Sequence, residues 1–247
     1  MKRKLWHLAL VGAMLLSVSP VLADGDFYVV AVGGGVGTKI TSLPYTISNP
    51  GFYYLSGNLT YTGTASAISI TADNVTLDLM GFSLTGGGKE IGTNTGISPN
   101  NNDNSRNVEI RNGTVSGFTV GVAGTFANER VSRIRAFNNN WGIWVPGSNP
   151  LIEGCISSNN DHGILVGSGR ISGCVANNNT NQGIAMNGTG AVIGCVANNN
   201  GTGFALNPPT SMPIMVDQNS ADSNGTNYGI GTNEFISWGV NAGRPTP

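Results

Sequence analysis

The chain has 247 residues, of which 39% are hydrophobic and only 10% are charged, and its formal net charge is −1. Most nucleic-acid-binding domains need a basic patch that this composition does not supply, so we expect no nucleic-acid partner. Small polar residues are abundant, but the apolar residues recur with a regular period. That pattern favours one ordered, elongated domain over a disordered chain.

The first 23 residues have the pattern of a signal peptide. Residues 2–4 are basic, residues 8–18 are apolar, and residues 21–23 form a small-residue cleavage site. The apolar stretch is too short to cross a bilayer, so we expect no membrane span. Cleavage would leave nine Lys and Arg against 13 Asp and Glu, and we expect the mature protein to be secreted or periplasmic.

The segment after the signal, residues 24–50, lies before the regular pattern and is predicted to cap the N-terminal end. A repeat architecture must cover its first turn or leave strand edges exposed. Regular alternation begins at Phe52, and in residues 75–79 it predicts that Leu77 points inward and Asp78 outward. Residues 86–106 are rich in Gly, Asn, Thr and Ser and are predicted to form a surface loop.

Between Arg130 and Gly231 one unit of about 20 residues recurs. Each copy carries Gly-Cys or its equivalent, then an asparagine run, then Gly followed by alternating apolar residues. A period in this range, with alternation inside each unit, predicts a coiled β-solenoid. We expect residues 51–232 to form about eight turns, and residues 233–247, with Phe235 and Trp238, to form a C-terminal cap and tail.

The three cysteines are spaced 19 and 21 residues apart, which is the period of the repeat itself. Cys155, Cys174 and Cys195 are therefore predicted to stack in successive turns, about 4.8 Å apart. A ladder of buried thiols is the favoured interpretation, and a disulfide between neighbouring turns remains an alternative. We expect no metal site, because no second thiol or histidine joins the cluster.

The asparagine runs recur at one position of successive repeats, and we expect them to form a corner ladder. Asn tolerates left-handed backbone geometry, and stacked Asn side chains bond to one another. The glycines that follow are predicted corner residues: Gly142, Gly163, Gly183, Gly203 and Gly229. In the strand after each corner, Ile143, Ile164, Ile184 and Phe204 should point inward, and Trp144, Leu165, Ala185 and Ala205 outward.

The segments 74–81 (Asn-Val-Thr-Leu-Asp-Leu-Met-Gly) and 107–113 (Asn-Val-Glu-Ile-Arg-Asn-Gly), with the repeat units, resemble the right-handed parallel β-helix proteins of the pectin-lyase-like superfamily. The likeness covers nearly all of the chain after residue 23. It implies an all-β, right-handed, single-stranded parallel β-helix of exported bacterial type. Enzymatic members (pectate lyases, polygalacturonases and mannuronan epimerases) act on acidic polysaccharides.

The catalytic motifs of those enzymes do not recur in this sequence. It has no adjacent Asp pair, no Gly-His-Gly, no Arg-Ile-Lys and no Asp-Pro-His-Asp. Arg133-Ile134-Arg135 only partly matches the Arg-Ile-Lys motif. The sequence shows no cluster of three carboxylates that could bind Ca²⁺. Because one fold hosts many activities, the resemblance identifies the scaffold more firmly than the function.

Two groups of residues depart from the repeat and are the candidate sites. Trp141 and Trp144, beside Asp161 and His162, suit a sugar-binding patch, and His162 is also a candidate general acid or base. The second group is a basic concentration of Arg130, Arg133 and Arg135, with Arg106 and Arg111 expected on neighbouring turns. The alternate spacing of Arg133 and Arg135 lets both project from one strand face. These arginines are candidates to neutralise a uronate carboxylate, or else members of a charge band with Glu109, Glu129 and Glu153.

We therefore predict an exported, monomeric β-helix protein that binds carbohydrate or another cell-surface polymer without catalysis. One alternative is a small lyase or hydrolase acting on uronic-acid polymers such as pectin or alginate, with Asp161, His162, Arg133 and Arg135 as catalytic residues. Only under that alternative would Ca²⁺ be required, and no other cofactor is expected. A second alternative is a structural module stacked end to end.

Overall fold

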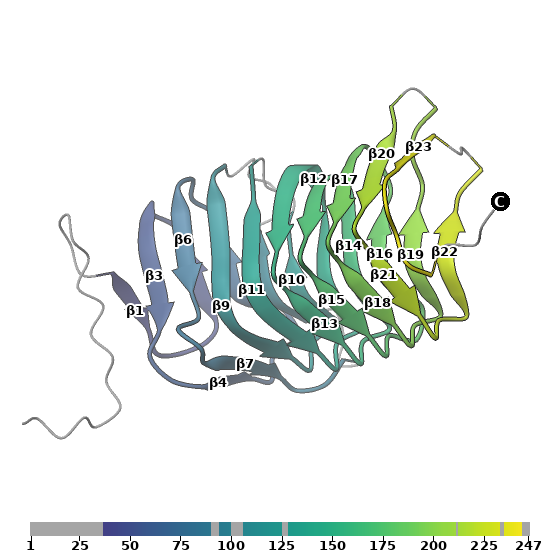
Figure 1. Cartoon of the computed structure of the whole chain (residues 1–247). Helices are drawn as coiled ribbons and strands as arrows, with labels where there is room; N and C mark the ends of the chain where they lie inside the picture. The colour runs from purple at the N-terminus through teal and green to yellow at the C-terminus, as the bar shows by residue number, and fades with distance from the viewer. Residues whose placement is uncertain are drawn as a thin grey trace, which may run out of the picture.

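A computed structural model describes residues 37–89, 94–99, 106–124, 128–210, 212–232 and 235–243. The predicted signal peptide, residues 1–23, and most of the predicted N-terminal cap lie outside the described residues. Every element of the described chain is a β-strand, and the strands pair in parallel as a β-solenoid of about eight turns (Figure 1). The predicted parallel β-helix architecture is confirmed.

The strands stack on three faces of the column, and the longest strands bend around a corner from one face to the next. Face 1 contains β1 (Thr38–Ile40), β3 (Gly51–Leu55), β6 (Val75–Asp78), the first halves of β9 (Val108–Ser116) and β11 (Arg130–Phe137), the second halves of β12 (Trp141–Glu153) and β14 (His162–Ser172), β17 (Gly190–Ile193), β20 (Ile214–Asp217) and β23 (Ile236–Trp238).

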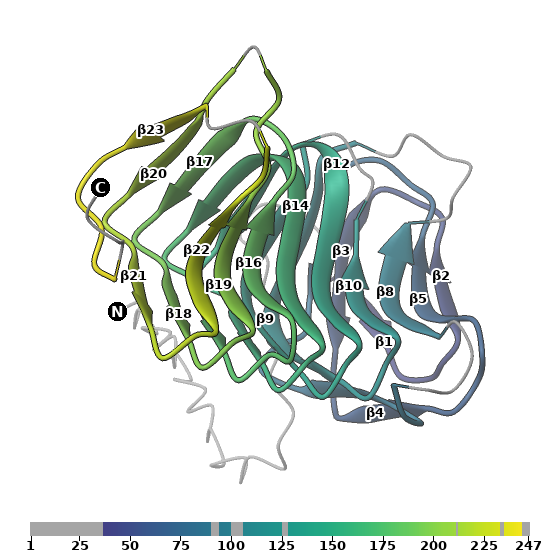
Figure 2. The same cartoon turned by 90° about the vertical axis from the view of Figure 1, so that its right-hand side faces the viewer.

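Faces 2 and 3 complete each turn. Face 2 contains β4 (Leu59–Tyr61), β7 (Ser83–Gly86), the second halves of β9 and β11, β13 (Ile156–Ser158), β15 (Val175–Asn177), β18 (Val196–Asn198) and β21 (Ser220–Asp222). Face 3, turned toward the viewer in Figure 2, contains β2 (Tyr45–Ile47), β5 (Ser66–Ile70), β8 (Thr95–Pro99), β10 (Val120–Ala123), the first halves of β12 and β14, β16 (Gln182–Met186), β19 (Thr202–Leu206) and β22 (Thr226–Ile230).

The core is the set of side chains that point into the column. Alternation along each strand places one residue in two inward, so stacked turns build columns of apolar side chains. On face 3 the predicted inward set is confirmed, because each member is at most 1% exposed: Ile143, Ile164, Ile184 and Phe204.

At the C-terminal end Phe204 stacks on Tyr228, with ring centroids 5.0 Å apart, and Trp238 packs edge-on against Tyr228 at 5.5 Å.

The corner between faces 2 and 3 is held by a buried asparagine ladder, as the sequence predicts. The backbone N–H of Asn160 donates to Oδ1 of Asn179 at 3.1 Å, and that of Asn179 donates to Asn200 at 3.0 Å. The Asn160 amide nitrogen also donates to the carbonyl of Ala136, one turn back, at 3.1 Å. Each amide thus joins neighbouring turns. The preceding residue is left-handed, with φ of 55° at Asn159, which Asn tolerates.

A cysteine ladder likewise joins neighbouring turns at the corner between faces 1 and 2. All three thiols are free and fully buried. The backbone N–H of Cys155 donates to Sγ of Cys174 at 3.4 Å, and that of Cys174 donates to Cys195 at 3.4 Å. Hydrogen bonding to the Cys155 thiol, together with burial, raises the pKa of Cys174 to about 12, so its thiol stays protonated. The ladder therefore fills space and closes the corner.

Two local predictions are wrong, for residues 95–99 and for Gly229. Residues 95–99, expected in a loop, form β8, which pairs with β5 and β10 and buries Ile97 fully. Asp78, predicted to point outward, is only 4% exposed, since Arg111 covers it with an ion pair of 2.8 Å. Gly229 pairs with Ala205 and not with Gly203, so it does not occupy the corner position. In addition, strands begin at Thr38, inside the segment expected to be a cap.

Candidate functional site

The outer surface of face 3 carries a row of apolar side chains that point away from the core yet are mostly covered. Leu165, Ala185 and Ala205 are 9%, 1% and 6% exposed and form a cluster separate from the main core, with Trp141 packed against it. Trp144 lies in register with Leu165 and stays 38% exposed. The predicted outward direction holds, and Trp144 is the exposed member of this row.

Beside that row lies a second outward row, whose members pair in register across four strands: Trp141, His162, Gln182 and Thr202. The rings of Trp141 and His162 stack at 3.9 Å with an interplanar angle of 6°. The Trp141 and Trp144 rings lie 6.2 Å apart at 41°. Trp141, Trp144 and His162 therefore form one aromatic cluster, called the aromatic platform below, in which the stacked faces of Trp141 and His162 cover each other and Trp144 is the most exposed ring.

His162 is mainly a flat, uncharged member of that platform. Burial lowers its pKa below the ordinary 6.5, because desolvation penalises the imidazolium. The neutral ring lies 3.4 Å from the Asn181 side-chain amide through Nε2. A neutral imidazole at pH 7 can accept a proton but makes a poor general acid.

Asp161 precedes His162 at the corner, and its carboxylate is paired with a lysine from a different part of the chain. Lys89 Nζ lies 2.6 Å from Asp161 Oδ1, and both side chains are about one-third exposed. Exposed pairs of this kind add little stability, but this one cancels the charge next to the platform. The Asp161 carboxylate, which the sequence suggested as a catalytic group, is therefore held in an ion pair with Lys89.

An open hollow of about 480 Å³ adjoins the platform on its C-terminal side, lined by His162, Thr180, Asn181, Gln182, Gly201 and Thr202. Every polar group in this set is a neutral amide, hydroxyl or imidazole. An extra corner residue helps to shape it. Gly183 follows Cys174 by nine positions, whereas Gly163 follows Cys155 by eight. The inserted turn is pinned by the Asn181 N–H, which donates to the Asp161 carbonyl at 2.8 Å.

The two candidate arginines lie elsewhere, at the corner between faces 1 and 2. Arg133 has a left-handed φ of 52°, and its Nε donates to Asn112 Oδ1 at 2.7 Å. Arg135 projects from face 2, where its Nε donates to Thr114 Oγ1 at 3.1 Å. Together they line a shallow hollow of about 360 Å³ with Gly154 and Ile156. They do not converge with Asp161 and His162.

A charge band forms on face 1 with Arg111 and Arg130, two members of the predicted basic group. Ion pairs run from Asp78 through Arg111 and Glu109 to Arg130 and Glu153, with N···O distances of 2.8 to 3.6 Å. In the described part of the chain, Arg133 and Arg135 form no ion pair. Glu129, directly before β11, is buried and 1% exposed.

Sequence reasoning found the platform but missed Lys89, Thr180 and Asn181. The extra residue between Cys174 and Gly183 is a signal that could have identified the inserted corner. Lys89 offers no such signal, because it lies 72 residues from its partner and outside the repeat.

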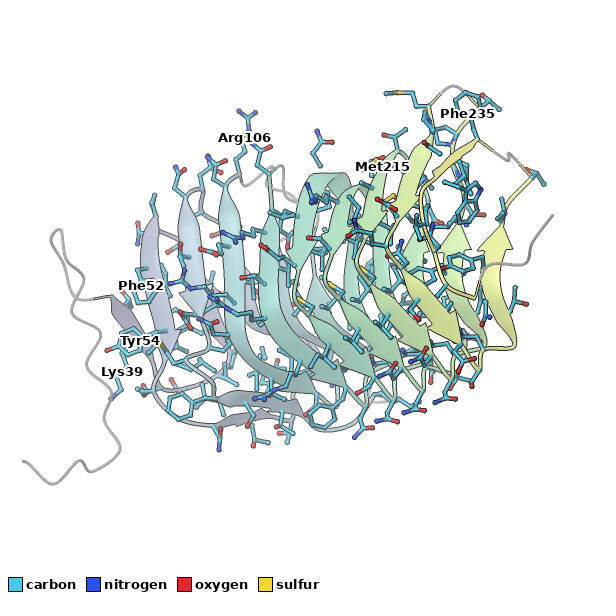
Figure 3. All side chains as sticks on the ribbon, viewed as in Figure 1. Lys39, Phe52, Tyr54, Arg106, Met215 and Phe235 are labelled. Atoms are coloured by element: carbon cyan, nitrogen blue, oxygen red, sulfur yellow. The ribbon has the colours of Figure 1, made fainter. Side chains whose placement is uncertain are left out.

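Several exposed apolar side chains gather at the C-terminal end of the column. Figure 3 labels Met215 and Phe235 there, and they are 44% and 50% exposed. Within the described ranges there is no group of three or more His, Cys, Asp or Glu side chains placed to hold a metal ion. Nor do those ranges include a helix long and apolar enough to span a membrane.

Comparison with known proteins adds no further identification: no family model, curated protein or solved structure matches this chain.

Proposed function

We propose that this protein binds polysaccharide through the outer surface of face 3 and does not cleave it. The observation that carries the proposal is the aromatic platform of Trp141, Trp144 and His162 beside an open polar hollow. Aromatic faces pack against the apolar faces of sugar rings, and neighbouring amides and hydroxyls bond to the ring hydroxyls. These groups lie on or beside paired strands, which reduces the entropy lost on binding. Export, as expected from residues 1–23, would bring the surface into contact with such polymers.

The catalytic alternative has less support. Most glycosidases place two carboxyl groups on either side of the scissile bond. Here Asp161 is the carboxylate beside the platform, and it is held by Lys89. A lyase acting on uronates would need a base near a cation that is free to meet the substrate carboxylate. The cation near His162 is Lys89, which is paired with Asp161, and Arg133 and Arg135 project from a different corner of the column. The pectin-lyase-like resemblance supports the parallel β-helix scaffold, but it assigns no catalytic role to the residues of this site.

The test is an array of immobilised polysaccharides, measured both for retention of the protein and for release of soluble sugar. We expect saturable retention with the polymer left intact. Trp144→Ala should lose retention, whereas Phe137→Ala, a matched aromatic on face 2 that is 36% exposed, should keep it. Release of reducing ends or unsaturated sugars would support the enzymatic alternative. Equal retention of both variants would contradict the proposed surface.

A further inference from the structure

The charges around the aromatic platform are cancelled or distant, and this restricts the class of polymer that the platform can hold. The lining of the adjoining hollow is uncharged, from Thr180 and Asn181 to Gln182 and Thr202. The nearest acid, Asp161, is neutralised by Lys89 at 2.6 Å. A ligand on this surface would therefore meet neutral amide and hydroxyl groups.

We infer that the face-3 site is built for an uncharged polysaccharide, and that uronic-acid polymers are poor ligands for it. The inference rests on the proposed function and names the ligand class of the same site. Amides and hydroxyls each donate and accept hydrogen bonds, as sugar hydroxyls do, so the two sets complement one another. A carboxylate only accepts, and sites that bind it normally supply arginine or lysine.

The cation beside this surface is Lys89, and it is paired with Asp161 at 2.6 Å. Arg111 and Arg130 are held in the ion-pair band of face 1. Arg133 and Arg135 line their own hollow at the corner between faces 1 and 2. An acidic polymer laid across the platform would lose part of its hydration, and Lys89 could pair with it only by leaving Asp161 unpaired, which is unfavourable. A neutral polymer would incur no such loss.

The length of the site suits a chain that crosses several turns. The row of Trp141, His162, Gln182 and Thr202 takes one residue from each of four successive strands. Neighbouring turns repeat about every 4.8 Å. The row is therefore continuous along the column, with the partly exposed Trp144 beside its N-terminal end. The hydroxyl groups of an extended sugar chain repeat along its length and can bond to successive members of the row.

The experiment is affinity electrophoresis of the full protein in gels containing neutral polymers (glucan, mannan, galactan or xylan) or acidic polymers (polygalacturonate or alginate), at low and high salt. We expect retardation by at least one neutral polymer, little change with salt, and a roughly tenfold loss in Trp144→Ala, which corresponds to about 1.4 kcal/mol. Phe137→Ala should behave as the wild type.

The outcomes separate the two proposals. Retardation only by acidic polymers, and its loss at high salt, would overturn the neutral-ligand inference while polysaccharide binding stands. No retardation by any polymer would overturn both. A pair of matched gels, polygalacturonate and its methyl ester, checks the charge directly: tighter binding to the free acid than to the ester would also overturn the inference.

Discussion

Two rows of side chains run side by side along the corner between faces 2 and 3, and they differ in how strictly they repeat. The inner row has the same residue in four successive turns: Asn139, Asn160, Asn179 and Asn200. The outer row changes at every turn, through Trp141, His162, Gln182 and Thr202. Each inner amide must match its neighbours above and below, whereas an outer side chain meets solvent. Repetition therefore builds the scaffold, and departure from it creates the proposed binding surface.

The largest effect on stability is expected from breaking the inner row. Asn179→Ala removes the acceptor for the Asn160 N–H and the donor to the Ser157 carbonyl. Buried groups left unpaired cost about 1–3 kcal/mol each, so we expect the free energy of unfolding to fall by about 3 kcal/mol. Denaturant unfolding measures this. The more exposed neighbour Asn181→Ala is the control, and equal losses in both variants would contradict the comparison.

The outer row should show the opposite behaviour. Trp144→Ala is expected to weaken polysaccharide binding about tenfold, because it removes the exposed part of the platform. Its melting temperature should change little, since Trp144 is 38% exposed and outside the core. Isothermal titration and thermal unfolding on the same samples separate the two readouts. A large drop in melting temperature with binding retained would reverse the assigned roles.

The inserted corner offers a more selective change. Deleting Asn181 should restore the shorter corner of the neighbouring turns and shrink the hollow beside His162. We expect a several-fold loss of affinity, smaller than that of Trp144→Ala, with the solenoid intact by circular dichroism. Unchanged affinity would show that the aromatic platform binds without help from the hollow.

The smallest expected effect is a pH dependence from His162. Burial lowers its pKa in the folded state, so the unfolded chain binds the proton more readily. The stability linked to the neutral ring is present above about pH 6.5 and is lost as the pH falls through the unfolded and then the folded pKa. His162→Gln should flatten the unfolding free energy between roughly pH 5 and pH 7. An unchanged slope in that variant would assign the dependence to other groups.

Much of the fold could be predicted because its physics is local and periodic. Alternation identified the inward columns, and the matching Cys and Asn spacings of 19 and 21 residues identified both ladders. Prediction was wrong where a segment has little apolar character of its own. β8 is placed by Ile97 and by pairing with β5 and β10, contacts that no short window of sequence reveals.

The candidate site was predicted only in part for a related reason. Trp141, Trp144, Asp161 and His162 stand out because they interrupt a repeat, and stacking turns brings them together. Lys89 reaches Asp161 from another part of the chain. Arg133 and Arg135 look suitable for the same site in sequence, but the corner between faces 1 and 2 directs them elsewhere. Which face a side chain occupies depends on corner positions, and a one-residue change there alters it.

The central claim, that face 3 binds polysaccharide through its aromatic platform, is tested most directly by NMR of the tryptophan indole N–H groups. Trp141 and Trp144 belong to the platform, whereas Trp238 packs against Tyr228 at the C-terminal end. Titration with a retained neutral oligosaccharide should shift the indole signals of Trp141 and Trp144 and leave that of Trp238 in place. Binding that moves only the Trp238 signal, or none of the three, would contradict the account.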